Sequence, residues 1–297
     1  MIIKKLHGVM AVLLVCAIVA FPSRVHAEYA EVHVLDLNNG RLDDYNAGDT
    51  LFVVGNRQLN AVGWETIREL TSKPFSLVFE NGQTSIPDDA MKYNETLISI
   101  TGEHVMTSVG ESALYGCSEL ESVYLPGVTS VGKNAFRYCN KLELDRYSMP
   151  ALKNVSETAL ADCVALETIY LPAATIVDFW AFYRSSYVWK VELPSVTYIG
   201  SRAFEGTDLE ELHLGNADPD VHPDAFYGVS GLAVYSDRKT LKARDQNRFP
   251  DDTIYYMDTS GGGSGCDAIS ASALAANAGM YLILCAAILL KRKPSRS

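Results

Sequence analysis

The stretch VGESALYGCSELESVYLPGVTSVGKNAFRYCNKL, residues 109–142, contains one pattern twice. Four residues after each starting valine lies an alanine, Ala113 or Ala135, and the next residue is large and apolar, Leu114 or Phe136. A pattern that recurs at a fixed period is the signature of a repeat protein. The same spacing is therefore expected elsewhere in the chain.

Seven units share this pattern, and their first positions are 23, 22, 24, 22, 22 and 22 residues apart. These first positions are Ile86, Val109, Val131, Val155, Val177, Ile199 and Val221. The alanine follows without exception, as Ala90, Ala113, Ala135, Ala159, Ala181, Ala203 and Ala225. We interpret the alanine as the residue of a tight turn, where a larger side chain would collide with the next unit. Its large apolar neighbour is interpreted as a core residue.

Each unit also contains a short alternating run that ends near a proline, such as ESVYLP at 121–126 and ETIYLP at 167–172. Alternation with a period of two predicts a half-buried strand. A unit with one strand cannot bury its apolar face alone, so neighbouring units must stack on each other. The sequence thus predicts a solenoid poor in α/β structure, with about seven 22-residue units over residues 86–231.

The units VGKNAFRYCNKL at 131–142 and IGSRAFEGTDLEEL at 199–212 resemble the BspA or treponemal class of leucine-rich repeats, and the resemblance extends from residue 86 to about 235. It implies a right-handed coil of stacked short strands and a role in bacterial surface adhesion. Two segments depart from the pattern. KLELDRYSMP at 141–150 carries a two-residue insertion, and TDLEELHLG at 207–215 lacks the proline and slips by one residue. We expect an irregular strand face at both.

Residues 28–85 and 232–258 do not fit the repeat and are predicted to be β-rich caps that cover the ends of the stack. The first cap is expected to contain strands at 31–37, 49–55 and 75–80 and a helix at 63–71. The second is expected to contain strands at 232–236 and 252–257, with a helix at 237–246 between them.

The N-terminal segment, residues 1–27, has the organisation of a secretory signal. Lys4 and Lys5 precede an apolar run of 13 residues, and Ala27 occupies the cleavage position. The mature protein is therefore expected to begin near Glu28, outside the cytoplasm.

The C-terminal segment is predicted to hold the protein at the membrane. A Gly/Ser linker at 259–267 contains Cys266, and residues 268–290 form an uncharged run long enough to span a bilayer. The basic residues of 291–297 are expected in the cytoplasm. The segment resembles the Synergist-CTERM sorting signal, which implies processing near Cys266 and attachment to the bacterial cell surface. The alternative is a plain single-span anchor.

The charge of the chain limits its partners. Between the two terminal segments, 18 basic residues face 36 acidic ones, a net charge of −18. Such a surface repels phosphate backbones, which argues against nucleic acid as a partner. It favours solubility and contacts with cations or basic proteins.

Cysteines, histidines and carboxylates give no catalytic or cofactor pattern, so no enzyme activity, cofactor or metal site is predicted. Cys117, Cys139 and Cys163 share one position of the repeat, which predicts a ladder of small buried residues, with a Cys117–Cys139 disulfide as the alternative. The acidic segments at 35–50 and 216–224 do not match a complete calcium loop and are better explained by turn formation.

The outward row of the strands is the predicted binding platform. Across the coils it reads Ser99, Tyr124, Ser148, Tyr170, Glu192 and His213, and its companion row reads Ser122, Arg146, Thr168, Lys190 and Glu211. Interfaces favour tyrosine and arginine. The alternative is that tyrosine simply suits an exposed strand. Tyr124, Arg146, Tyr170, Lys190, Glu192 and His213 are therefore candidate binding residues.

Two tryptophans break the polarity of the repeat and are also candidates. Trp180 occupies a position that is otherwise Asp, Ser, Asn, Thr or Arg, and Trp189 occupies one that is otherwise Glu. A tryptophan on a solvated surface needs cover, either from neighbouring side chains or from a partner. The sequence therefore favours a non-enzymatic surface recognition or adhesion protein that binds a protein or an extracellular polymer. The alternative is a self-assembling structural component of the envelope, and the sequence leaves the oligomeric state open.

Overall fold

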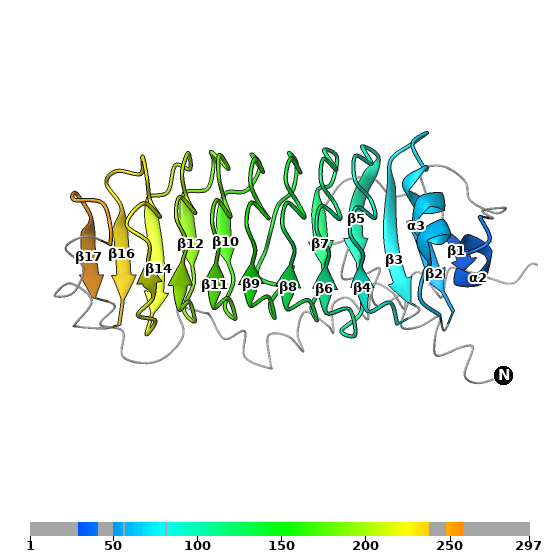
Figure 1. Ribbon diagram of the computed structural model, residues 1–297, viewed down its shortest axis with the longest axis horizontal. Helices are drawn as coiled ribbons and strands as arrows, with labels where there is room; N and C mark the ends of the chain where they lie inside the picture. The colour runs from blue at the N-terminus through cyan, green and yellow to red at the C-terminus, as the bar shows by residue number, and fades with distance from the viewer. Residues whose placement is uncertain (1–28, 41–49, 56, 81, 238–247, 258–297) are drawn as a thin grey trace, which may run out of the picture. The chain divides into compact units, whose positions relative to one another are not determined.

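The computed structural model describes residues 29–40, 50–55, 57–80, 82–237 and 248–257. All of them belong to one compact unit, Ala27–Thr259, which forms a β-solenoid of about nine turns with little helix (Figure 1). Ala27, Cys266 and the predicted segments at 1–27 and 259–297 lie outside the described residues. Among the residues that are described, none forms an apolar helix of the length that a bilayer requires.

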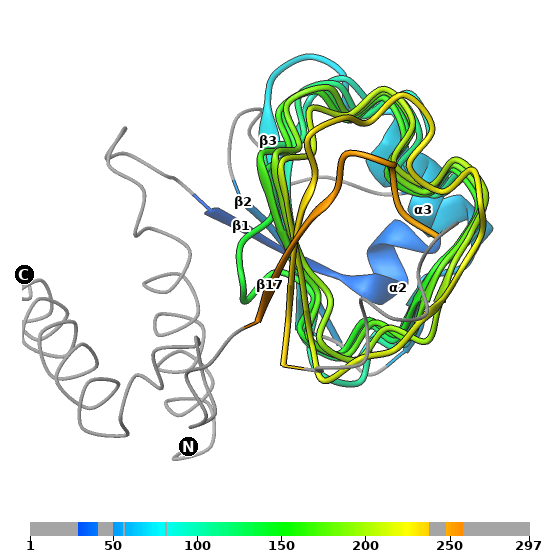
Figure 2. The ribbon, with the colours of Figure 1, turned by 90° about the vertical axis from the view of Figure 1, so that its left-hand side faces the viewer.

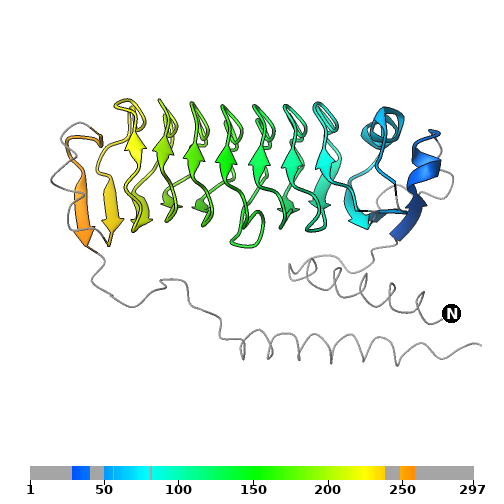
Figure 3. The ribbon, with the colours of Figure 1, turned by 60° about the horizontal axis from the view of Figure 1, so that its bottom comes forward.

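Two walls of parallel strands run along the solenoid, as Figures 2 and 3 show. One wall contains the longer strands, in two sheets. The first sheet has the order β1 (Tyr29–His33), β2 (Thr50–Val54), β3 (Phe75–Glu80), β5 (Leu97–Thr101) and β7 (Ser122–Tyr124). The second has the order β10 (Thr168–Tyr170), β12 (Lys190–Glu192), β14 (Glu211–Gly215), β16 (Ala233–Ser236) and β17 (Ile254–Met257).

The other wall is a single sheet of seven two-residue strands. Its members in order along the chain are β4 (Ser85–Ile86), β6 (Ser108–Val109), β8 (Ser130–Val131), β9 (Asn154–Val155), β11 (Ile176–Val177), β13 (Tyr198–Ile199) and β15 (Asp220–Val221). The sequence predicted one strand per unit, and the structure has two in most coils. A two-residue strand is too short to produce a visible alternation, which is why the pattern did not reveal it.

The core lies between the walls and follows the repeat. The seven alanines are buried, and so are the seven large residues beside them. Near the C-terminal end, the ring of Phe204 stacks between those of Phe182 and Phe226, with centroids 5.3 Å apart on each side. These columns confirm the predicted role of both positions, because each coil fills its interior against the next.

The two-residue insertion interrupts the wall of longer strands. The coil between β7 and β10 contributes no strand to this wall, although it keeps the short strands β8 and β9 on the other wall. Asp145 there accepts hydrogen bonds on Oδ1 from Tyr147 N at 2.8 Å and from Ser148 Oγ at 2.9 Å. The second predicted irregularity, at 207–215, appears as a longer strand β14 with a register shift between His213 and Gly215. Both departures from the repeat therefore disturb the strand face.

The predicted caps contribute strands that continue the same wall in parallel register. β1, β2 and β3 lead into β5, and β16 and β17 follow β14. The predicted strand at 31–37 ends early, because the short helix α2 (Val34–Leu37) replaces its second half. Helix α3 (Ala61–Arg68) confirms most of the helix predicted at 63–71, but it begins two residues earlier, after its N-cap Asn60, and ends three residues earlier. Of the helix predicted at 237–246, all but the first residue lies outside the described part of the chain.

Hydrogen bonds from one coil to the next define the turn that contains the alanine. Asn134 illustrates its backbone: φ is 56°, in the left-handed region, and its N–H donates to the carbonyl of Glu157 in the next coil at 3.1 Å. The equivalent residues with φ between 52° and 56° are Asp89, Ser112, Asn134, Thr158, Trp180 and Arg202. Asn and Asp tolerate this conformation better than most residues, which explains why the position is usually polar.

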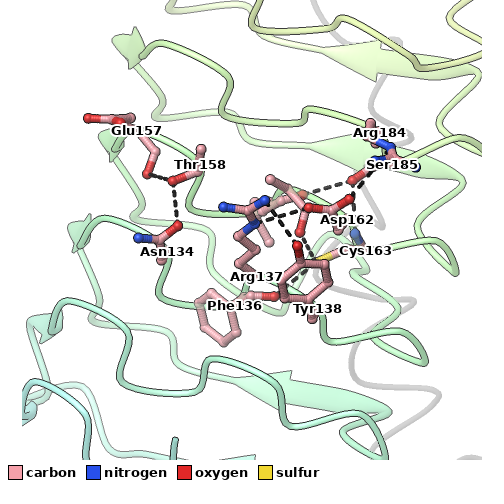
Figure 4. Close-up of polar contacts among 12 residues, drawn as sticks. Asn134, Phe136, Arg137, Tyr138, Glu157, Thr158, Asp162, Cys163, Arg184 and Ser185 are labelled. Atoms are coloured by element: carbon pink, nitrogen blue, oxygen red, sulfur yellow. Dashed lines mark hydrogen bonds and ion pairs between the residues drawn. The ribbon is translucent and has the colours of Figure 1, made fainter. Parts of the chain in front are cut away.

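Polar side chains also link the coils, as Figure 4 shows. Asp162 receives a hydrogen bond from Arg137 Nε at 3.0 Å and lies 3.8 Å from Arg184 Nε. The Asp162 carboxylate is only 12% exposed, so it binds the two arginines of neighbouring coils in a partly desolvated setting.

The cysteine column is a hydrogen-bonded ladder and not a disulfide. Cys117, Cys139 and Cys163 are free and buried, and each Sγ donates to a carbonyl of the preceding coil at 3.0–3.2 Å. Ser185 continues the ladder through Oγ to the carbonyl of Leu160 at 2.8 Å. The alternative of a Cys117–Cys139 bridge is therefore wrong. Burial raises the pKa of Cys117 and Cys163 to about 12, so both thiols stay protonated at neutral pH.

Candidate binding face

The outward side of β10, β12, β14, β16 and β17 forms a continuous polar and aromatic face. Along each strand, apolar residues such as Ile169, Val191 and Leu212 point into the core, so the residues between them point outward. The strand register sets one outward row as Tyr170, Glu192, His213, Tyr235 and Tyr256. The companion row is Thr168, Lys190, Glu211, Ala233 and Ile254.

The centre of this face is a network of charged side chains. Lys190 Nζ lies 3.3 Å from Glu192 and 3.6 Å from Glu211, and Glu211 Oε2 lies 3.1 Å from His213 Nε2. All four side chains are partly exposed, at 25–31% of their surface. Their mutual contacts fix the positions of hydrogen-bond donors and acceptors that remain open to a ligand.

An aromatic ladder continues from the charged network to the last strand. The rings of His213 and Tyr235 are stacked, with centroids 4.3 Å apart and planes 4° apart, and Tyr256 stacks on Tyr235 at 4.8 Å. Desolvation, together with the nearby Glu211 carboxylate, raises the pKa of Tyr235, so its hydroxyl remains a donor at neutral pH. The stack holds the rings in fixed positions, which lowers the entropy lost on binding.

Arg146 lies at the start of this face, in the coil that contains the insertion and has no longer strand. Its guanidinium carbon lies 5.9 Å from the centre of the Tyr170 ring. Tyr170, Glu192 and His213 share one row and Lys190 lies in the companion row, in the predicted order. Arg146, expected in the companion row, instead lies over Tyr170 of the other row.

Tyr124 does not belong to this group. It pairs with Thr101, not with Ser99, and it lies on β7 in the other five-stranded sheet, beyond the coil without a strand. The predicted row also included Ser148, but this residue is buried in the turn that it forms with Asp145. The irregular strand face expected at this insertion thus removes Ser148 from the outward row.

The two tryptophans have different environments. Trp180 lies on the turn, away from the strand face. Its ring contacts Phe179 at 4.1 Å and Tyr183 at 5.2 Å, so neighbouring side chains provide its cover. Trp189 directly precedes β12 and is 39% exposed, so it lies at the edge of the binding face.

Tyr235 and Tyr256 were not among the predicted binding residues, because their segments were assigned to the C-terminal cap. The alternation in LAVYS at 232–236 marks Tyr235 as an outward residue, and this signal could have extended the predicted row by one strand. Tyr256 could not be placed without knowing that β17 is parallel to β16.

No metal-binding cluster of three or more His, Cys, Asp or Glu side chains occurs in the described segments. In the acidic segment at 216–224, Asp218 lies 3.7 Å from Arg248 in an ion pair. The other acidic segment includes residues 41–49, which the structure does not describe.

A model of the BspA type leucine-rich repeat region matches residues 70–188, 107–233 and 153–254 of the chain. The chain belongs to this family. The BspA-type repeat thus accounts for the resemblance noted in the sequence, and the match includes all of the binding face up to β17. No curated protein matched the sequence.

Solved structures of bacterial leucine-rich repeat proteins are similar to parts of this BspA-type chain. A leucine-rich cell surface protein from Faecalibacterium prausnitzii is 27% identical over 53% of the chain, with a TM-score of 0.45, and the chain covers 44% of that protein. The T. pallidum leucine-rich repeat protein is 18% identical over 63% of the chain and 88% of its own length, with a TM-score of 0.50. A Bacteroides ovatus protein is 18% identical, covering 63% of this chain and 48% of that one, with a TM-score of 0.49.

Proposed function

We propose that this protein is a non-enzymatic recognition or adhesion protein of the bacterial cell surface, which binds a protein or an extracellular polymer through the face of β10–β17. The observation that carries the proposal is the ladder of His213, Tyr235 and Tyr256, whose rings stack at 4.3 and 4.8 Å on an outward strand face. Pre-ordered aromatic side chains beside fixed charged groups are typical of binding surfaces.

The cell-surface location rests on the sequence. The predicted signal at residues 1–27 and the predicted anchor at 268–290 support export and attachment, and the resemblance to a Synergist-CTERM signal supports processing near Cys266. Membership of a repeat family agrees with a binding role, because repeats build extended surfaces rather than enclosed catalytic sites.

The ligand can be identified by presenting the full chain, in mild non-ionic detergent, to a glycan array and to surface extracts in a pull-down, each with and without calcium. A verified ligand then allows the face to be tested. Replacing Tyr235 and Tyr256 by serine together should weaken binding at least tenfold, because both rings leave the platform. Tyr198→Ser is a matched control, since Tyr198 is equally an exposed strand tyrosine but lies on the opposite wall.

Unchanged binding in the double variant, with its circular dichroism spectrum intact, would show that the ligand uses another surface. If the screen recovers only further copies of this chain, the structural alternative of a self-assembling envelope component is correct instead.

A further inference from the structure

Two exposed aromatic side chains lie where the chain enters strand β12. Tyr187 is 63% exposed and Trp189 is 39% exposed. Val188 between them is fully buried, so the two rings flank a residue that points into the core. Within the described residues, neither ring stacks on another aromatic side chain or faces a cation. Unlike Trp180, Trp189 therefore has no aromatic cover from its own coil.

The repeat itself does not require an aromatic residue at this position. The backbone N–H of Trp189 donates to the carbonyl of Glu167 at 3.0 Å, and the N–H of Glu210 donates to the carbonyl of Trp189 at 2.8 Å. Trp189 thus replaces a glutamate in a column whose other members are Glu121, Glu143, Glu167 and Glu210. The fold accepts a solvated side chain here, so a large exposed apolar ring at this point calls for an explanation outside the fold.

The charge around the rings indicates what covers them. Glu167 and Glu210 lie in the coils on either side of Trp189, both are exposed, and neither forms an ion pair with another described residue. Elsewhere on the solenoid carboxylates do find cations, as in the pairs of Glu157 with Lys133, Asp162 with Arg137 and Glu205 with Arg202. The carboxylates of Glu167 and Glu210 therefore keep an uncompensated negative charge on both sides of Trp189, which attracts cations from outside.

We propose that Tyr187 and Trp189 form an aromatic dock for a lysine- or arginine-bearing segment of a partner protein. The ring of tryptophan is the best aromatic acceptor for an ammonium or guanidinium group, and the flanking glutamates add charge complementarity. The net charge of −18 between the terminal segments attracts a basic partner at long range. This dock lies beside the strand face and does not depend on the ligand of that face.

A decalysine peptide with a fluorescent label is a direct probe, and its affinity for the full chain in non-ionic detergent can be measured by fluorescence anisotropy. The same peptide with acetylated lysines carries no side-chain charge and should bind at least tenfold more weakly. Trp189→Phe retains a ring and should bind decalysine within about threefold of the wild type.

Trp189→Glu distinguishes the dock from simple charge attraction, because the two predict opposite changes in the affinity for decalysine. The variant restores the glutamate of the column and adds one negative charge, so charge attraction alone would tighten decalysine binding. Loss of the ring should instead weaken it about fivefold or more, in the range of a desolvated cation–π contact. Tyr198→Glu adds the same charge on the opposite wall, at a tyrosine that is 37% exposed, and should not weaken binding.

Unchanged or tighter binding in Trp189→Glu, with an intact circular dichroism spectrum, would overturn the dock. Equal binding of the acetylated peptide would overturn its cation specificity. The variant with both Tyr235 and Tyr256 replaced by serine should bind decalysine like the wild type. The experiment on the dock and the experiment on the strand face can therefore fail independently of each other.

Discussion

Trp180 donates a hydrogen bond from Nε1 to the Oε2 atom of Glu205, one coil further along the chain, at 3.1 Å. Together with its stacking on Phe179 and Tyr183, this bond makes the indole part of the fold. The residue keeps a φ of 55°, in the left-handed region, where its backbone is strained. A structural role therefore accounts for this tryptophan without a partner.

Trp180→Ala should lower the free energy of unfolding by about 1–2 kcal/mol, through lost apolar contact and the lost hydrogen bond. Trp180→Asn should cost less than Trp180→Ala, because asparagine adopts the left-handed region readily, as Asn134 does at the equivalent position. Urea unfolding of the full chain, followed by circular dichroism, measures both. Equal losses in the two variants would contradict the role assigned to the backbone.

Asp162→Asn should lower the free energy of unfolding by about 1–2 kcal/mol, because it removes the partly buried charge that accepts the hydrogen bond of Arg137 and attracts the more exposed Arg184. Asparagine tolerates the φ of 56° at this position, so the change isolates the charge. Glu119→Gln is the matched control, since the ion pair of Glu119 with Lys141 at 2.6 Å is exposed. It should change stability by less than about 0.5 kcal/mol. Equal effects of the two variants in the same urea titration would contradict the prediction.

The buried thiols should make the protein less stable in alkali. Cys117 and Cys163 have pKa values of about 12 in the folded state, above the ordinary value of 9.0. Between these values the unfolded chain releases protons that the folded chain retains, so the free energy of unfolding falls as pH rises from 9 towards 12.

Replacing Cys117 and Cys163 by serine should reduce this fall, because serine does not titrate in that range and Ser185 already occupies the same column. Urea unfolding at pH 8 and pH 10.5 gives the difference for each protein. An equally steep fall in the variant would assign the alkaline effect to other groups, such as tyrosines. In addition, iodoacetamide should not modify Cys117, Cys139 or Cys163 at pH 8 before unfolding, which peptide mass spectrometry can check.

Gly127→Ala should be among the most damaging single changes in the repeats. A Cβ atom at Gly127 would lie 2.0 Å from the carbonyl oxygen of His104 and 2.8 Å from that of Met106. Backbone atoms cannot yield as a flexible side chain does, so the loss should reach about 3 kcal/mol. Gly228→Ala is the matched control, because it adds the same methyl group where no atom lies within 4 Å and φ is +81°. It should lower the free energy of unfolding by about 1–2 kcal/mol. A smaller loss at Gly127 than at Gly228 in urea unfolding would contradict the prediction.

The repeat made most of the fold predictable. The alanine and its large neighbour recur at fixed distances because every coil meets the same packing problem, and both columns are buried as expected. The two-residue strands β4, β6 and β8 could not be predicted, because their wall is defined by hydrogen bonds to neighbouring coils and not by a pattern within one coil. The number of coils was underestimated for the same reason, since cap strands such as β2 and β16 pair like repeat strands without their sequence pattern.

The candidate site was predicted in part. The regular repeats placed Tyr170, Glu192 and His213 in one row, and the structure pairs them in that order. The alignment paired Tyr124 with Ser99, whereas Tyr124 pairs with Thr101 between β5 and β7. In addition, the missing longer strand at the insertion leaves Tyr124 in a separate sheet from Tyr170. The stacking of Tyr235 on His213 could not be predicted either, since it depends on side-chain orientation across strands that share no motif.

The wall of short strands passes the insertion without a break, because β8 pairs directly with β9 although the longer strands on either side of it are in separate sheets. The extra residues between Asp145 and Ser148 are absorbed within one coil, and the next coil resumes its register. This position is therefore a natural point of variation in evolution and in engineering. A longer loop grafted here would be displayed beside Tyr170, at the start of the binding face, while the opposite wall keeps the coils aligned.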